Sequence, residues 1–138
     1  MKRQSNTERL AAIPLFSGLT TKQLAAVDAL VTEVHVEPGR ELIRQGEIGR
    51  EFFLVVDGEA QVQRDGVVLA NRGPGAFFGE TALLLDQRRN ARVVAITAMN
   101  LQVINQQDFR RLVGEHPELR SALFEATARH RTESGAAS

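Results

Sequence analysis

The chain has 138 residues, 43% of them hydrophobic, which is enough for one buried core but not for two independent domains. Its 17 basic and 17 acidic residues cancel, so no strong overall field draws the protein to nucleic acid or to an anionic membrane, while a local anion site stays possible. Cysteine is absent, which excludes a disulfide framework, a thiolate zinc site and a cysteine nucleophile.

The beginning of the chain, MKRQSNTERLAAIPL, has no apolar segment as long as that of a secretory signal. No later window approaches the roughly 18 apolar residues of a membrane helix. We therefore expect a cytoplasmic protein without direct membrane contact.

Residues 7–30 have a helical pattern. Leu10 and Ile13 lead into Pro14, and Thr20 precedes Gln23 by three residues, which is the spacing of a capping box before a helix. We expect short helices that flank the main body of the domain.

Between residues 31 and 105 the pattern changes to short alternating runs, which predict strands at 31–36, 41–44, 51–56, 59–64, 67–71, 93–97 and 101–105. Turn signals separate them, and the pairs Asp57-Gly58 and Asp65-Gly66 favour tight hairpins because glycine tolerates positive φ. Closely spaced antiparallel strands predict a sandwich or barrel, and a jelly roll is the natural closure because two facing sheets cover otherwise exposed edges.

A second helical region follows the strands. Asn105 can cap a helix that Gly114 ends, and Pro117 can begin a last helix that extends to about Thr132. Apolar residues fall on one face of that helix, at Leu119, Ala122, Leu123 and Ala126. We place a single, mainly β domain with flanking helices at 7–132 and a disordered tail at 133–138.

The segment GAFFGETALLLDQRRNARVV, residues 75–94, combines glycines, an apolar run, a carboxylate and arginines. The run 81–85 can form one helical turn opened by Gly79, whose free N–H groups make an anion site. If the chain reverses after it, Arg89 approaches the same place, and its planar guanidinium matches phosphate oxygens. Glu80 could accept a hydrogen bond from a sugar hydroxyl, so phosphate and ribose together describe a nucleotide.

Two simpler interpretations remain open from the residues alone. Glu80 and Arg89 could form an ion pair across a loop, and Arg88 could be a solvated surface charge. Spacing does not choose between these and the nucleotide site.

The string FGETALLLDQRRNARV, residues 78–93, resembles the phosphate-binding cassette of cyclic nucleotide-binding domains, whose pattern is F-G-E-x-A-L followed by an Arg, a small residue and Ala. The resemblance extends to residues 13–20, similar to the N-terminal helical motif, to 46–59, similar to the second and third strands, and to 73–80, which lead into the cassette. Ordered matches over roughly 120 residues are more specific than any single one.

The resemblance implies these ligand-binding residues: Gly79, Glu80, Thr81, Ala82, Leu83, Arg89, Asn90, Ala91 and Arg131. Gly79 and Glu80 would face the ribose, backbone groups around Ala82 and Leu83 would cap the phosphate, and Arg89 would pair with its exocyclic oxygens. The two C-terminal helices would act as hinge and lid, with Arg131 or Arg129 contacting the base edge and Leu123 and Phe124 as apolar candidates.

The sequence departs from the family pattern at two positions. Asn90 stands where Ala, Ser or Thr is usual, which leaves base selectivity open, and Asp86 adds a negative charge where Gly is common. The regulatory ligand that the resemblance implies is a cyclic purine nucleotide, cAMP rather than cGMP, and no other cofactor. A ligand-free fold that acts as an interaction or dimerisation module is the alternative.

The sequence lacks the residue patterns that a metal site or an enzyme would need. His35, His116 and His130 are scattered rather than clustered as a metal site requires, and no G-x-S-x-G or P-loop motif is present, so we expect no metal and no enzymatic activity. We expect no nucleic-acid contact, because no helix-turn-helix follows the last helix. An effector domain or protein, or a second copy of the chain, is the partner that a sensor would need.

Overall fold

The computed structural model describes the backbone of residues 6–79 and 87–133, and the side chains of these residues except Thr7 and residues 126–133. The N-terminal elements are α1 (Asn6–Ala11), the short 3-10 helix η1 (Pro14–Phe16) and α2 (Thr21–Asp28). The predicted capping box is confirmed: the Thr20 hydroxyl accepts from the Gln23 N–H, and the Gln23 side chain accepts from the Thr20 N–H. Among the described residues, no helix has both the length and the apolar character that crossing a bilayer requires.

In the described part of the chain, eight strands form the body of the domain: β1 (Thr32–Val36), β2 (Glu41–Ile43), β3 (Glu51–Asp57), β4 (Ala60–Arg64), β5 (Val67–Arg72), β6 (Phe77–Phe78), β7 (Arg92–Ala95) and β8 (Met99–Asn105). They make two four-stranded antiparallel sheets, in the orders β1-β8-β3-β6 and β2-β7-β4-β5. This is a jelly roll, so the predicted fold is confirmed. The two-residue strand β6 is an addition, because it is too short to show an alternating pattern.

The two Asp-Gly pairs have different roles. Asp65-Gly66 closes the predicted β4–β5 hairpin, with φ of 53° and 80°. The prediction for Asp57-Gly58 was wrong, because this pair carries the chain from β3 in one sheet to β4 in the other. A Cβ at Gly58 would lie 2.4 Å from the Ala98 carbonyl oxygen, so the crossover needs glycine for close approach as well as for its φ of 93°.

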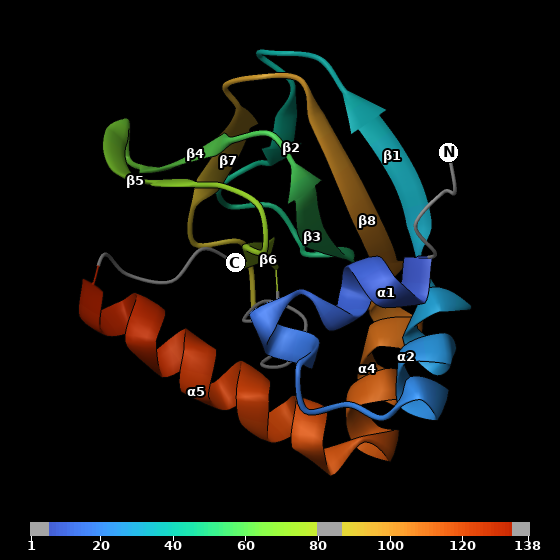
Figure 1. Ribbon diagram of the computed structural model, residues 1–138. Coiled ribbons are helices and arrows are strands. Elements are labelled where there is room, and N and C mark those ends of the chain that lie inside the picture. The colour runs from blue at the N-terminus through green and yellow to red at the C-terminus, as the bar shows by residue number, and fades with distance from the viewer. Residues whose placement is uncertain (1–5, 80–86, 134–138) are drawn as a thin grey trace, which may run out of the picture.

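The core has two parts. One lies between the sheets, and the other lies where the helices cover the end of β3, around Phe52, which stacks on Phe109 at 4.6 Å and on Phe77 at 5.9 Å between ring centroids. Figure 1 shows the helices gathered at one end of the two sheets, with α5 passing beneath the sheets in this view. The helices therefore pack as one group against one end of the roll.

Two C-terminal helices, α4 (Gln106–Glu115) and α5 (Pro117–Glu133), follow β8 directly. The side chain of Asn105 accepts from the Asp108 N–H at 2.8 Å and caps α4 as predicted. α4 continues one residue beyond its predicted end at Gly114, and α5 continues one residue beyond its predicted end at about Thr132. Residues 134–138 lie outside the described part of the chain.

On the outer surface, the Glu41 carboxylate forms ion pairs with Arg92 and Arg44. Hydrogen bonds from Arg92 and then from Arg44 hold the pKa of Glu41 below its usual value of 4.5. A lowered folded-state pKa means that this stabilisation is present above the unfolded value and is lost as the pH falls through the folded value. Glu41→Gln should thus destabilise the protein, by ~1 kcal/mol or less, near neutral pH and not in acid.

Urea unfolding of wild type and Glu41→Gln at about pH 7 and about pH 3 measures this difference. An identical gap in free energy of unfolding at both pH values would contradict the assignment.

Candidate functional site

Arg89 is the central residue of the candidate site. Its side chain is only 6% exposed, although an arginine is usually solvated. One terminal nitrogen donates to the Gly79 carbonyl at 3.2 Å, and the other donates to the Glu51 carbonyl at 2.7 Å. The guanidinium is thus held in one orientation between the end of β6 and the beginning of β3.

The backbone of Arg89 is held by the loop between β2 and β3. Its N–H donates to the Glu47 carbonyl at 2.7 Å, and its carbonyl accepts from the Gly46 N–H at 2.8 Å. Neighbouring Arg88 pairs with Ile48 in an isolated bridge and is itself exposed, donating to the Gly46 carbonyl at 3.1 Å. The two adjacent arginines therefore point to different environments, and the interpretation of Arg88 as a surface charge is confirmed.

Gly79 is a glycine for a steric reason. Its φ is +102°, and a Cβ there would lie 2.6 Å from the Glu51 carbonyl oxygen and 2.7 Å from the Arg89 Nη1. Both contacts are closer than real Cβ atoms make, so any side chain would displace the guanidinium or the strand. Gly79 and Arg89 thus depend on each other.

Asn90 and Ala91 follow the arginine into the sheet. The Asn90 carbonyl accepts from Arg64 Nε at 2.9 Å, and the Asn90 side chain is half-buried. Ala91 is fully buried between the sheets, where a larger residue would collide with its neighbours. This explains its small size independently of any ligand.

Some predicted site residues are not placed. Glu80, Thr81, Ala82, Leu83 and Asp86 lie outside the described residues, and so does the predicted helical turn at 81–85. Arg129 and Arg131 lie on α5, but their side chains belong to the part that is not described.

Of the apolar lid candidates, Leu123 is wholly buried and Phe124 is 58% exposed. In this conformation the Leu123 side chain packs in the helical core, and its contact with a base stays a prediction. The apolar face of α5 is thus core packing at Leu119, Ala122 and Leu123. Phe124 remains an accessible candidate.

Sequence reasoning missed Glu51, Glu47 and Arg64. Glu51 and Glu47 contribute backbone carbonyls, which carry no signature in the side-chain pattern. Arg64 uses its side chain, but its target is the carbonyl of Asn90, 26 positions away. No local sequence pattern predicts a contact between residues so far apart in the chain.

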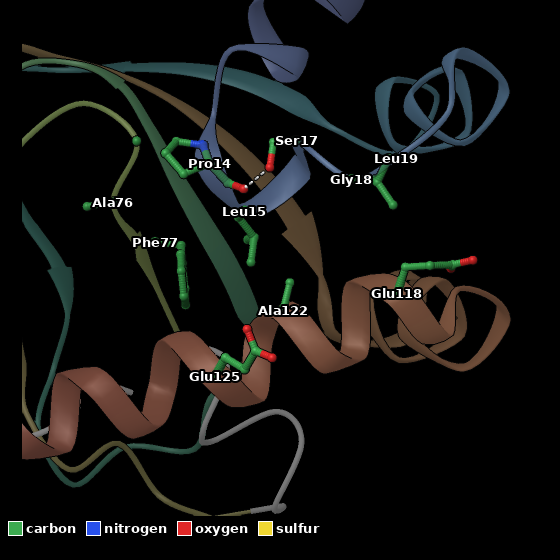
Figure 2. A pocket seen from close by; sticks show the side chains of 11 residues that line it. Pro14, Leu15, Ser17, Gly18, Leu19, Ala76, Phe77, Glu118, Ala122 and Glu125 are labelled. Atoms are coloured by element: carbon green, nitrogen blue, oxygen red, sulfur yellow. Dashed lines mark hydrogen bonds between the residues drawn. The ribbon is translucent and has the colours of Figure 1, made fainter.

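A groove of about 420 Å³ lies between η1, α5 and the segment 75–77. Figure 2 shows Leu15 and Phe77 on its apolar side, with Glu118, Ala122 and Glu125 along the facing side of α5. Phe77 is two residues before Gly79. The groove therefore separates α5 from the strand that leads into the candidate site.

The histidine side chains that the structure describes form no metal centre. His35 on β1 lies 3.0 Å from the Asn100 side-chain oxygen and 3.1 Å from a Glu37 carboxylate oxygen, and these hydrogen bonds raise its pKa. Within the described residues, no group of three His, Asp or Glu side chains could hold a metal ion.

Comparison with known proteins gives consistent matches. The family model described as "Cyclic nucleotide-binding domain" matches residues 33–116. A relative from Schizosaccharomyces pombe, named a cAMP-dependent protein kinase regulatory subunit, is 39% identical over 80% of this chain and 27% of its own length. One from Mesorhizobium japonicum, named a cyclic nucleotide-gated potassium channel, is 36% identical over 91% of this chain and 35% of its own.

Among solved structures, the catabolite activator protein of Thermus thermophilus superposes with a TM-score of 0.78 at 29% identity, over 87% of this chain and 59% of that one. The chain thus spans between about a quarter and about a third of the length of these two curated relatives, 27% and 35%. The activities of those whole proteins therefore do not transfer directly.

Proposed function

The chain belongs to the cyclic nucleotide-binding domain family, and from this premise we propose that it is a regulatory sensor that binds a cyclic purine nucleotide, cAMP in preference to cGMP, and signals by movement of its C-terminal helices. Binding would involve the nine residues implied by the family resemblance, with Arg89 on the phosphate. The domain would have no catalytic activity, need no other cofactor, and act in the cytoplasm on an effector domain or protein or on a second copy.

The observation that carries this proposal is the geometry of Arg89. Two backbone carbonyls fix the guanidinium beside Gly79, the second residue of the cassette. A positively charged fork held in one orientation and shielded from water suits a negatively charged phosphodiester, because two of its N–H groups can reach two phosphate oxygens. Shielding also strengthens the attraction, because the local dielectric is low.

The proposed signal route passes through the groove in Figure 2. Segment 75–77 forms one side and leads to Gly79, while α5 forms the other side through Ala122 and its neighbours. A ligand that shifts the cassette would move this strand and so change the packing of α5. The signal would require α5 to have two discrete packings, because a population shift needs two states.

The preference for cAMP has one support, which is that the Schizosaccharomyces pombe relative is named for cAMP dependence. Asn90 leaves the base selectivity open. Competition between cAMP and cGMP for binding to the domain would measure this base selectivity.

Thermal unfolding with and without nucleotide tests the function. A ligand at one hundred times its Kd adds about 2.7 kcal/mol to a native state that alone binds it. For a chain of this length we expect cAMP at about 1 mM to raise the midpoint by roughly 10 °C, and cGMP to raise it less. AMP, which lacks the cyclic phosphodiester, is the matched control.

The second candidate function is a ligand-free interaction or dimerisation module, favoured by the departures at Asp86 and Asn90. An unchanged midpoint with both cyclic nucleotides would contradict the sensor and support this module. Sedimentation of the same samples would then show whether two copies associate.

A further inference from the structure

Gln45 ties two exposed turns of the roll together. It lies in the loop between β2 and β3, and its side-chain amide faces Asp65, the first residue of the β4–β5 turn. Its Nε2 donates to the Asp65 carboxylate at 2.8 Å, and its Oε1 accepts from the Asp65 N–H at 3.0 Å. Because donor and acceptor are different atoms of one amide, the pair fixes both the distance and the orientation of the two turns.

The residues next to Gln45 hold Arg89. Gly46 donates its N–H to the Arg89 carbonyl, and Glu47 accepts from the Arg89 N–H, at 2.8 and 2.7 Å. These loop residues are exposed, and Ile48 beyond them is 58% exposed. A loop with little buried apolar surface depends on its hydrogen bonds for its position.

The same hairpin reaches the arginine segment a second time. Arg64, the residue before Asp65, donates from Nε to the Asn90 carbonyl at 2.9 Å. The end of the β4–β5 hairpin therefore contacts the backbone next to Arg89 directly, through Arg64, and also through the loop that Gln45 anchors. Figure 1 shows this hairpin projecting from the body of the roll.

We propose that Gln45 is a positioning residue for Arg89: by tying the β2–β3 loop to the β4–β5 turn, it holds the arginine backbone where the guanidinium meets the cyclic phosphate. This inference rests on the proposed function for its effect on binding. Its structural part, that Gln45 keeps the Arg89 backbone in place, can be measured without any ligand. Preorganised groups lose effect when their supports allow displacements of about 1 Å.

Exchanging the amide and the carboxylate between positions 45 and 65 tests the hydrogen-bonded pair. Gln45→Glu places two carboxylates against each other, so we expect cAMP to bind about threefold to tenfold more weakly, mainly through faster dissociation. Asp65→Asn keeps an oxygen for Gln45 and suits the positive φ at this turn, so its effect should stay within about twofold. In the double variant the amide introduced at position 65 can donate to the carboxylate introduced at position 45, and the affinity should return to within about twofold of wild type.

The matched control is Gln107→Ala, which removes an exposed glutamine on α4. All variants should unfold within a few degrees of this control when ligand-free. If Gln45→Glu binds cAMP as tightly as wild type, or if adding Asp65→Asn to it fails to restore the affinity, the proposal is overturned.

Amide hydrogen exchange separates this proposal from the proposed function. Without nucleotide, the Arg89 and Gly46 amides should exchange faster in Gln45→Glu than in wild type, and at the wild-type rate in the double variant. Unchanged exchange of both amides would refute the positioning role. If wild type binds neither nucleotide, the sensor function fails, and the exchange rates alone then decide whether Gln45 holds Arg89.

Discussion

Arg89→Ala should weaken the binding of the cyclic nucleotide by about 30-fold or more. Truncating one partner of a buried charged pair costs about 2–5 kcal/mol, and 2 kcal/mol corresponds to about a 30-fold change in Kd. We expect a large effect because Arg89 is only 6% exposed. In the variant, the bound phosphate would lose a partner that is shielded from water rather than a solvated one. Calorimetric titration with cAMP and cGMP measures it.

The chain offers a matched control in the neighbouring arginine. Arg88→Ala removes the same charge from an exposed position and should change Kd by about twofold or less. Equal losses in Arg88→Ala and Arg89→Ala would indicate a general electrostatic effect. Unchanged affinity in Arg89→Ala would remove the phosphate assignment.

A stability effect of Arg89→Ala must be separated from the binding effect. The variant leaves the Gly79 and Glu51 carbonyls without this donor, which costs about 1–3 kcal/mol. Arg89→Lys keeps the charge and loses the planar fork, so it should also bind weakly while remaining folded. Circular dichroism of both variants before titration confirms that the fold is intact.

Gly79→Ala should have a similarly large effect, on both stability and nucleotide affinity. An alanine at φ +102° is strained by about 1–3 kcal/mol, and its Cβ at 2.6 Å from the Glu51 oxygen adds overpacking of about 1–3 kcal/mol. The same Cβ at 2.7 Å from Nη1 must displace the Arg89 guanidinium. We therefore expect loss of stability by urea unfolding, together with loss of nucleotide affinity.

Gly39→Ala separates the two causes. Gly39 has φ +90°, and a Cβ there meets nothing within 4 Å, so this variant carries the backbone strain without the clash. Gly79→Ala should lose more stability than Gly39→Ala by about 1–3 kcal/mol, and Gly39→Ala should bind nucleotide normally. Equal free energies of unfolding would show that the close approach at Gly79 is relieved elsewhere.

Local patterns in the sequence predicted most of the elements. Among the residues that the structure describes, seven of the eight strands were expected, because alternation and turn residues act over a few positions. The caps at Thr20 and Asn105 were predicted from patterns of the same short range. The role of Gly58 was missed because an Asp-Gly pair favours a tight turn in any context. Only its contact with Ala98, 40 positions away, makes it a crossover between sheets.

The sequence by itself determined the jelly roll, the flanking helices and the position of the cassette, because periodicity, capping and the string from Phe78 to Val93 are readable over short distances. Only the tertiary structure showed that Arg89 is buried while its neighbour Arg88 is exposed. The physical reason is that the burial depends on backbone carbonyls 10 and 38 positions away, which look the same in every residue and are brought to the guanidinium only when the sheets close.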